Sequence, residues 1–370
     1  MKILQVCSAE QMGGGERHVA DLTRALIERG HSLHLAVRES SPLPAALAEL
    51  PVTWHRFPLR NALDLPSAFH LARLIRRHRI DLLHAHVARD YPTCGLAARL
   101  APEVRLFLTR HHFHPLRANP LYRWALGRTE RFLAVSRSVA AGLAQSFPDL
   151  APRLSVIPNW LDPLVLEGAR PRDEARRILG ITRPLAVGLL GQLTPLKRQD
   201  LFLDAVGQLI EQGLAAEAEF LLVGAPGPDD HAFAAELRAR VETRQGDEGQ
   251  VRLLGYVPAL PSLLSAFDVV VAPSTNEAFS LVLIEAMASG CAVIASRTGG
   301  MAEIVEDEAT GLLIPPNDLD ALTRTLARAL SDPSLRSRLG LAASQSTRTR
   351  FARADILDQI ESLYLLSPPD

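Results

Sequence analysis

The sequence predicts an α/β protein with two consecutive Rossmann-like domains, each a doubly wound parallel sheet flanked by helices. Short apolar runs alternate with segments of helical periodicity along the whole chain. A cluster of turn residues interrupts this alternation near the middle. The length of 370 residues leaves room for about two domains.

The first forty residues show the alternation most clearly. An apolar run at 3–6 is followed by a polar, Gly-rich loop at 8–15. From Glu16 apolar residues recur at helical spacing as far as Gly30, which stands where a helix C-cap is expected, and residues 33–37 alternate as a strand. Three more strands are predicted to end in His84-Ala85-His86, Thr109-Arg110-His111 and Ser136.

Turn residues between Ile157 and Pro171 predict a linker, after which a second series of strands and helices begins. We therefore expect an N-terminal domain at 1–165, a C-terminal domain at 166–350 and a final amphipathic helix at 351–370. Strands of the second series are predicted at 185–190, 220–223, 253–254, 269–272 and 292–295.

Composition excludes several classes of protein. Hydrophobic residues make up 47% of the chain and charged residues 22%, which is typical of a globular protein and excludes a disordered chain, a collagen or a coiled coil. Three scattered cysteines without a CxxC pair predict neither a disulfide framework nor a zinc site. The N-terminus enters an apolar run directly and no segment approaches about 20 apolar residues, so we expect a cytoplasmic protein.

Charge is divided unevenly between the halves. Residues 1–165 hold 21 Lys and Arg against 13 Asp and Glu, a net charge of +8, whereas the whole chain has −1. The total disfavours a nucleic-acid binder, and the basic half predicts an anionic partner. The segment 71–80 is the most basic, and a second basic segment follows at 117–131. The first segment carries Arg73, Arg76, Arg77 and Arg79.

These basic segments have two interpretations. One is a solvated helix face packed on a sheet. The other is contact with a phosphorylated acceptor or with anionic lipid, which would hold the protein peripherally on the inner face of the cell membrane.

Three consecutive glycines, Gly13–Gly15, precede the first predicted helix. Glycine lets a backbone approach a ligand closely, and a helix N-terminus favours an anion. His18 stands where a GxGxxG motif has its third glycine, so a nicotinamide dinucleotide is disfavoured. A purely structural turn is the alternative interpretation.

Lys197 is notable because the chain contains only one other lysine, Lys2. It belongs to the loop Gly191–Arg198, which follows the predicted strand 185–190. A lysine at the end of a strand can neutralise a phosphate leaving group as a compact charge. An ordinary surface lysine is the alternative.

Two glutamates, Glu277 and Glu285, flank the start of an apolar helix that follows the strand 269–272. If this helix begins near Ser280, its free N–H groups face a ligand phosphate. The two carboxylates can then accept hydrogen bonds from sugar hydroxyls.

Taken in order, these motifs resemble glycosyltransferase family 4, the retaining enzymes of the GT-B fold. The segment from Glu277 to Gly290 is similar to the family signature, and Gly191–Lys197 resembles its phosphate-binding loop. The resemblance covers nearly the whole chain. Its other members are Gly13–Glu16, His84–His86, Thr109–His111, Val156–Asn159, Val223–Gly224, Val293–Gly300 and Gly311–Pro316.

The resemblance implies a fold with a cleft between the domains and a C-terminal helix that crosses back to the first domain. It also implies a role for each matching residue. Implied catalytic residues are His111, near the anomeric carbon and the acceptor, Glu277 and Lys197, with His112 and His114 as competitors of His111. Implied contacts to the donor diphosphate are Gly14, Gly15, Gln192, Lys197, Arg198, Ser280 and Leu281. Implied contacts to the rest of the donor are Glu277, Ala278 and Phe279 for the sugar, Glu285 for the ribose, and Gly224, Tyr256 and Val257 near the base.

Three positions depart from the family pattern. Gln192 replaces the usual arginine beside the lysine, which makes Arg198 a candidate substitute. Ala278 replaces a glycine in the sugar loop, and Trp160 replaces a glycine after Asn159.

The resemblance implies transfer of a hexose-type sugar, with retention, from a nucleoside-diphosphate sugar to a saccharide or lipid-linked acceptor in envelope polysaccharide or glycolipid synthesis. No cofactor is expected. No metal is expected either, because Lys197 supplies a charge for the diphosphate. Two alternatives stay open: a nucleotide-sugar 2-epimerase, and a non-catalytic subunit that binds a nucleotide sugar.

Overall fold

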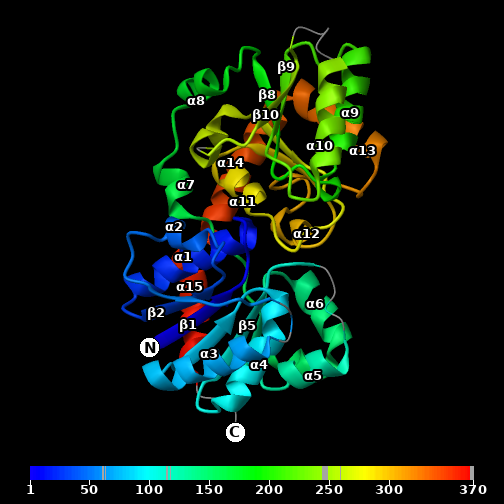
Figure 1. Ribbon diagram of the computed structural model, residues 1–370. Helices are drawn as coiled ribbons and strands as arrows, with labels where there is room; N and C mark the ends of the chain where they lie inside the picture. Colours follow the sequence, from blue (N-terminus) through cyan, green and yellow to red (C-terminus); the bar gives the residue numbers. More distant parts are fainter. Residues whose placement is uncertain are drawn as a thin grey trace. The chain divides into compact units, whose positions relative to one another are not determined.

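A computed structural model of the chain divides into two compact units (Figure 1). Residues 1–159 and 354–370 form the N-terminal unit, and residues 160–353 form the C-terminal unit. The structure describes all residues except 61, 63, 114, 115, 117, 244–248, 259 and 367–370.

The N-terminal unit is a seven-stranded sheet in the order β3-β2-β1-β4-β5-β6-β7, with every pairing parallel. This confirms the predicted α/β class. The strands are β1 (Lys2–Cys7), β2 (Ser32–Val37), β3 (Thr53–Arg56), β4 (Leu82–Ala85), β5 (Arg105–Arg110), β6 (Arg131–Ala134) and β7 (Leu154–Val156). The helices are α1 (Gly14–Glu28), α2 (Leu43–Ala46), α3 (Leu65–His78), α4 (Tyr91–Leu100), α5 (Pro120–Leu126), α6 (Arg137–Ser146) and α15 (Arg353–Leu365).

The C-terminal unit is a six-stranded sheet in the order β10-β9-β8-β11-β12-β13, again parallel throughout. The strands are β8 (Leu185–Leu190), β9 (Ala218–Val223), β10 (Val251–Gly255), β11 (Val269–Ala272), β12 (Ala292–Ser296) and β13 (Leu312–Ile314). The helices are α7 (Pro163–Glu167), α8 (Arg172–Leu179), α9 (Gln199–Glu211), α10 (His231–Thr243), α11 (Leu281–Ala288), α12 (Met301–Ile304), α13 (Leu319–Ser331) and α14 (Pro333–Arg350).

The last helix, α15, belongs to the N-terminal unit, and Figure 1 shows it in red among the blue and cyan elements there. Its residues Ile356, Leu357, Ile360 and Tyr364 are buried. Arg105 donates to the carbonyl oxygens of Tyr364 and Leu366 near the end of the helix and also binds Glu130. Arg29 also forms ion pairs with Asp358 and Glu361 of the helix, and Nε2 of His31 lies 2.8 Å from Oε1 of Glu361.

Boundaries differ from the expected ones by a few residues. The C-terminal unit begins at Trp160 and not at 166, because Trp160 is buried and the Leu161 N–H donates to the Phe351 carbonyl. Helix α1 begins at Gly14, two residues before Glu16, because the Glu16 carboxylate accepts from the Gly13 N–H at 2.9 Å and closes the first turn.

Candidate active site

Lys197 lies in a loop whose shape depends on glycine. Strand β8 ends at Leu190, and the next residue, Gly191, has φ +135°. A Cβ atom on Gly191 would lie 3.8 Å from the Lys197 Nζ atom, so the lysine passes close over this turn. The loop therefore delivers the ammonium group to the carboxyl end of the sheet.

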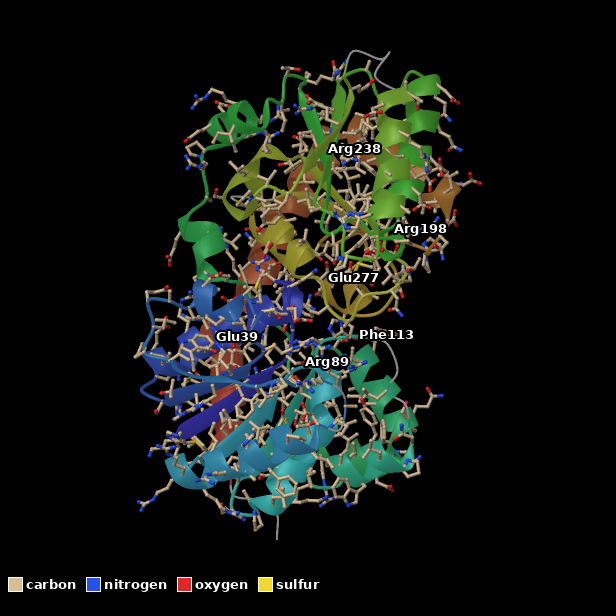
Figure 2. All side chains as sticks on the ribbon, viewed as in Figure 1. Glu39, Arg89, Phe113, Arg198, Arg238 and Glu277 are labelled. Carbon is tan, nitrogen blue, oxygen red and sulfur yellow. The ribbon has the colours of Figure 1, made fainter. Side chains whose placement is uncertain are left out.

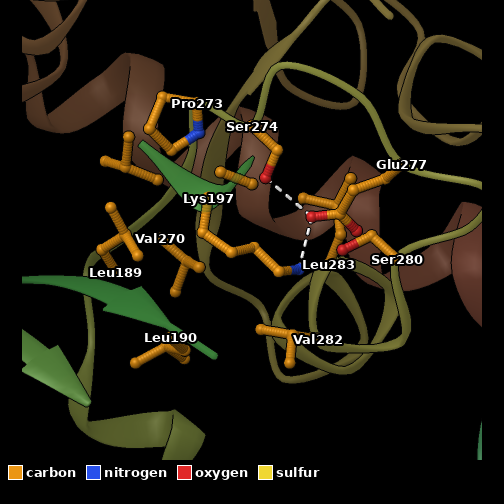
Figure 3. A pocket seen from close by; sticks show the side chains of 12 residues that line it. Leu189, Leu190, Lys197, Val270, Pro273, Ser274, Glu277, Ser280, Val282 and Leu283 are labelled. Atoms are coloured by element: carbon orange, nitrogen blue, oxygen red, sulfur yellow. Dashed lines mark hydrogen bonds and ion pairs between the residues drawn. The ribbon is translucent and has the colours of Figure 1, made fainter. Parts of the chain in front are cut away.

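Glu277 meets this ammonium group from the loop after β11. The Lys197 Nζ atom lies 2.5 Å from Oε1 of Glu277, and the Ser274 hydroxyl lies 2.7 Å from the same oxygen (Figure 3). A backbone bond from the Thr275 N–H to the Leu196 carbonyl joins the two loops. They are neighbours because β8 and β11 pair directly, so their carboxyl ends coincide.

Close backbone packing supports the Glu277 loop from behind. Gly299 has φ +51°, and a Cβ atom there would lie 2.1 Å from the Glu277 carbonyl oxygen. A Cβ atom on Gly300 would lie 2.3 Å from the Ala278 carbonyl oxygen, and the Gly300 N–H donates to Glu277. A side chain at either position would collide with the Glu277 loop, so only glycine fits there. These two glycines therefore allow the Glu277 loop to pack closely against the chain at 299–300.

Helix α11 begins directly after this loop, with Ser280 as its N-cap, as the sequence predicts. The Ser280 side chain makes no capping hydrogen bond to the helix. The N–H groups of the first turn are therefore not capped by this residue, which favours an anion at the helix start. Glu285 follows one turn later and is only 4% exposed.

A pocket brings these parts together. Its polar lining residues are Lys197, Ser274, Glu277 and Ser280 (Figure 3). Its apolar lining is Leu189, Leu190, Val270, Val271, Ala272, Pro273, Val282 and Leu283. Such a site offers a cation, a carboxylate acceptor and a helix start within one small space.

Arg198 has other partners. Figure 2 labels Arg198 in the C-terminal unit. Its Nε atom lies 3.0 Å from Asp200, and its guanidinium also donates to Asn317. Neighbouring Gln192 is exposed, and its side-chain nitrogen would lie 2.1 Å from a Cβ atom on Gly227. The charge of Arg198 is thus neutralised by Asp200 in this structure, and Gln192 adds no charge of its own.

The remaining residues that the resemblance places near the donor lie at neighbouring strand ends. Gly224 follows β9, and a Cβ atom there would lie 1.8 Å from the Gly191 carbonyl, so the two turns touch. Tyr256 follows β10 and is 73% exposed. Phe279 packs edge-on against Phe351 at 5.6 Å, and the added methyl group of Ala278 is buried.

A cluster of histidines occupies the carboxyl end of the N-terminal sheet. His111 follows β5, and its ring lies 4.9 Å from that of His18 in α1 and 5.7 Å from that of His86. The His86 ring lies 4.1 Å from that of His84. The sequence motifs identified His84, His86 and His111, whereas His18 was considered only as a departure from a glycine motif.

The Gly-rich loop borders this cluster. A Cβ atom on Gly15 would lie 3.5 Å from the Cβ of His111, so the start of α1 packs on that histidine. His112, the competing choice, is exposed. His114, the other competitor, lies outside the described residues.

Burial controls the protonation of the cluster. Loss of hydration lowers the pKa of His18 to about 4. The same cause holds the pKa values of His84, His86 and His111 well below the usual range, and the neighbouring histidines lower them further. All four rings are therefore neutral at pH 7.

Comparisons with known proteins agree with this arrangement. Residues 12–163 match the model described as Glycosyltransferase Family 4, and residues 184–332 match Glycosyl transferases group 1. The chain belongs to glycosyltransferase family 4.

Two relatives of this glycosyltransferase align along nearly the whole chain. It is 26% identical to the UDP-Gal:alpha-D-GlcNAc-diphosphoundecaprenol alpha-1,3-galactosyltransferase of Escherichia coli, over 99% of this chain and 97% of that one. It is 25% identical to the N-acetyl-alpha-D-glucosaminyl L-malate synthase of Bacillus anthracis, over 95% and 94% of the two chains. The crystal structure of Anabaena HepE in complex with UDP superposes with a TM-score of 0.85 at 24% identity, over 99% and 100% of the chains, which confirms the GT-B fold.

Helix α3 of this glycosyltransferase exposes cations and apolar side chains together. Arg73, Arg76 and Arg77 are exposed, as are Leu65 (48%) and Phe69 (58%), whereas Leu71 and Ile75 face the core. Arg79 follows the helix in a left-handed C-cap conformation.

Among the residues that the structure describes, no helix is both long and apolar enough to cross a bilayer.

The described side chains also show whether a metal ion could be held at the site. Within the described ranges, no group of three or more His, Cys, Asp or Glu side chains converges in a way that could hold a metal ion. This includes the histidine cluster, whose rings pack on one another.

Proposed function

We propose that this glycosyltransferase transfers a hexose from a nucleoside-diphosphate sugar to a saccharide or lipid-linked acceptor, with retention of the anomeric configuration. The single observation that carries the proposal is the convergence of Lys197, Glu277 and the start of α11 on one pocket. A cation and free N–H groups suit the diphosphate, and a carboxylate suits the hydroxyls of the sugar.

The proposed chemistry follows from charge. Cleavage of the bond between the anomeric carbon and the diphosphate leaves negative charge on the phosphate, which Lys197 and the start of α11 stabilise. The acceptor oxygen forms its bond to the same face of the sugar, and its proton passes to the leaving phosphate. Glu277 holds the sugar hydroxyls, Glu285 the ribose, and the turns at Gly224 and Tyr256 flank the base. No divalent metal takes part.

Residues of the N-terminal unit are proposed to serve the acceptor side of the reaction. His111 faces the anomeric carbon and the acceptor hydroxyl, and Gly14 and Gly15 approach the diphosphate. A neutral His111 suits an uncharged hydroxyl, because its Nδ1 atom donates or accepts one hydrogen bond according to the tautomer.

The Escherichia coli relative guides the choice of substrates. Its name specifies a UDP-sugar donor and a diphosphoundecaprenol-linked acceptor. We therefore propose uridine donors and lipid-linked saccharides of envelope or glycolipid synthesis as the first substrates to test. The basic and apolar face of α3 supports peripheral contact with an anionic membrane that carries such an acceptor.

A donor panel tests the proposal. UDP-, GDP- and ADP-hexoses are incubated with lipid-linked and free saccharide acceptors, with and without EDTA. Transfer that withstands EDTA, with a product whose anomeric proton coupling matches that of the donor, is the expected result. Inversion or loss of transfer in EDTA would contradict the corresponding part of the mechanism.

Two further outcomes decide the alternatives. An epimerised sugar nucleotide formed from the donor alone would indicate a 2-epimerase. Calorimetry that detects no binding of UDP, GDP or ADP would favour a non-catalytic subunit, for which the missing charge at Gln192 and the Asp200 partner of Arg198 already offer a reason.

A further inference from the structure

A line of buried side chains connects the C-terminal helix to His111. The Tyr364 hydroxyl lies 2.7 Å from Nδ1 of His84, whose Nε2 lies 2.7 Å from the Thr109 hydroxyl. The His84 ring packs on His86, and Nδ1 of His86 lies 3.4 Å from Nε2 of His111. Each member of the line therefore touches the next.

Tyr364 is held firmly at the start of this line. Its side chain is fully buried, and its ring meets Phe107 edge-on at 5.2 Å and 90°. Helix α15 is fixed at this point because Arg105 donates to the Tyr364 carbonyl oxygen. The hydroxyl of Tyr364 is thus presented to His84 from a rigid support.

His84 transmits that rigidity to His86. Both ring nitrogens of His84 have hydroxyl partners, so its ring cannot rotate without breaking two hydrogen bonds. The centroids of the His84 and His86 rings are 4.1 Å apart. The plane of His86 is consequently limited by the plane of His84, and with it the direction in which Nδ1 of His86 faces His111.

The far end of the line requires a defined ring orientation. His86 and His111 are neutral, so each has one N–H group, and one of them donates to the other. Within the described part of the chain, Nε2 of His86 and Nδ1 of His111 have no hydrogen-bond partner. In both possible tautomers, one of these two outer nitrogens is a donor and the other is an acceptor. Which of them is the donor depends on which ring donates in the hydrogen bond between the rings.

We propose that Tyr364 is a positioning residue, which holds His84 and through it keeps His86 bonded to His111 in a single tautomer. The proposal rests on the proposed function, in which His111 faces the reacting centre. It gives the C-terminal helix a part in the reaction although no residue of that helix touches His111 in the contacts described above.

The test compares Tyr364→Phe with the wild-type chain. This change keeps the aromatic ring and its contact with Phe107 but removes the hydroxyl. We expect kcat to fall by at least about threefold, while the Kd for UDP and the KM for the donor stay within about twofold. Thr109→Val removes the other anchor of His84 and is expected to have the same effect, with the double variant less than additive.

Tyr91→Phe is the matched control. Tyr91 is another fully buried tyrosine of the same unit, and its hydroxyl donates to the backbone carbonyl of Thr109 at 2.6 Å. We expect this variant to lose stability to a similar extent as Tyr364→Phe and to keep wild-type kcat. Equal kcat in the Tyr91 and Tyr364 variants would overturn the proposal.

Nitrogen NMR of the full chain with 15N-labelled histidine gives a readout that does not depend on turnover. Loss of the single tautomer of His86 and His111 in Tyr364→Phe, seen as averaged nitrogen shifts, is the expected result. Unchanged shifts would overturn the proposal even if no substrate were found. Absence of transfer by the wild-type chain with every donor would instead refute the proposed function.

Discussion

Lys197 and Glu277 form an ion pair, with 2.5 Å between Nζ and Oε1. Before a donor binds, the only lysine of the C-terminal unit is thus neutralised by the carboxylate proposed to hold the sugar. A bound diphosphate must compete with Glu277 for this ammonium group, and the Glu277 carboxylate is then available to sugar hydroxyls. Donor binding and the arrangement of the sugar site are therefore coupled through one pair of atoms.

Removal of either partner is expected to lower turnover by at least about tenfold. In Lys197→Ala the leaving phosphate loses its cation, so kcat and UDP affinity fall together. In Glu277→Ala the sugar loses an acceptor while UDP retains Lys197, so kcat falls more than UDP affinity. Steady-state kinetics and calorimetry with UDP measure the difference.

The chain offers a matched control for the lysine. Lys2→Ala removes the only other lysine, which is exposed and lies on β1 of the N-terminal unit. It is expected to keep wild-type turnover. Near-normal turnover in both Lys197→Ala and Glu277→Ala would contradict the assignment of the donor site.

Gly299 is predicted to be irreplaceable for a steric reason. Gly299→Ala places a methyl group against the Glu277 carbonyl oxygen and adds the cost of a left-handed conformation. Gly213→Ala is the control, since Gly213 has φ +70° but open space around its Cβ position. In urea unfolding, the loss of unfolding free energy is expected to be at least about 2 kcal/mol larger for Gly299→Ala than for Gly213→Ala. An equal loss of unfolding free energy in the two variants would mean that the Glu277 loop moves aside for the added methyl group.

Acid is predicted to destabilise the N-terminal unit. An unfolded histidine binds a proton near pH 6.5, whereas folded His18 does so only near pH 4. Folding stability therefore falls as the pH drops below about 6.5, by about 3 kcal/mol in total for this residue. His84, His86 and His111 act in the same direction. Asp90 and Glu16 oppose them, because burial raises the pKa of Asp90 to about 6 and that of Glu16 above its usual range, so that their protonation stabilises the fold. His34 and His55 of the same unit add to the effect of the four histidines, since burial lowers their pKa values as well.

The buried cysteines allow this prediction to be checked unit by unit. Cys7 and Cys94 lie in the N-terminal unit and Cys291 in the C-terminal unit, and all three are free and buried. Labelling with a disulfide reagent that reacts in acid, followed by mass spectrometry at pH 7 and pH 5, reports which thiol becomes accessible. We expect Cys7 and Cys94 to react faster at pH 5 while Cys291 changes little. The opposite order would show that the histidines do not control acid stability.

The exposed face of α3 is predicted to bind anionic vesicles. Arg73→Gln with Arg77→Gln removes two cations from this face, and Phe69→Ser removes its most exposed aromatic ring. Cosedimentation with phosphatidylglycerol vesicles at low salt is expected to weaken in both variants, and high salt should release the wild-type protein.

A charge-matched variant separates this effect from net charge. Arg177→Gln with Arg324→Gln removes two exposed arginines from the C-terminal unit and should leave vesicle binding unchanged. Equal weakening in the two double variants would indicate unspecific attraction. Failure of the wild-type protein to bind at low salt would refute the membrane contact and leave the donor-site proposal intact.

The meeting of Lys197 with Glu277 could be predicted from the sequence better than the packing of the histidine cluster. Lys197 and Glu277 each follow a strand, and parallel strands bring their carboxyl ends to one edge, so a meeting of the two loops was foreseeable. The contact of Tyr364 with His84 depends on where a helix 280 residues further along the chain packs, which no local pattern specifies.

Short edge strands were also missed by sequence reasoning. β3 (Thr53–Arg56) and β7 (Leu154–Val156) lie at the two edges of their sheet and are only partly buried, so they lack the apolar run that marked the central strands. The role of Gly299 was likewise underestimated. A glycine pair in a sequence indicates a turn, whereas the structure assigns Gly299 and Gly300 a packing role against the Glu277 loop.

The return of α15 to the N-terminal unit has a consequence for synthesis on the ribosome. Residues 1–159 emerge first, yet the helix that covers Phe107 and His84 emerges only after the whole C-terminal unit has been made. The C-terminal unit can close while the nascent N-terminal sheet still exposes that apolar surface, so the unit made first is completed last. Chains that end before residue 353 would carry a folded C-terminal unit beside an incomplete N-terminal unit, and such chains are natural clients for chaperones and proteases.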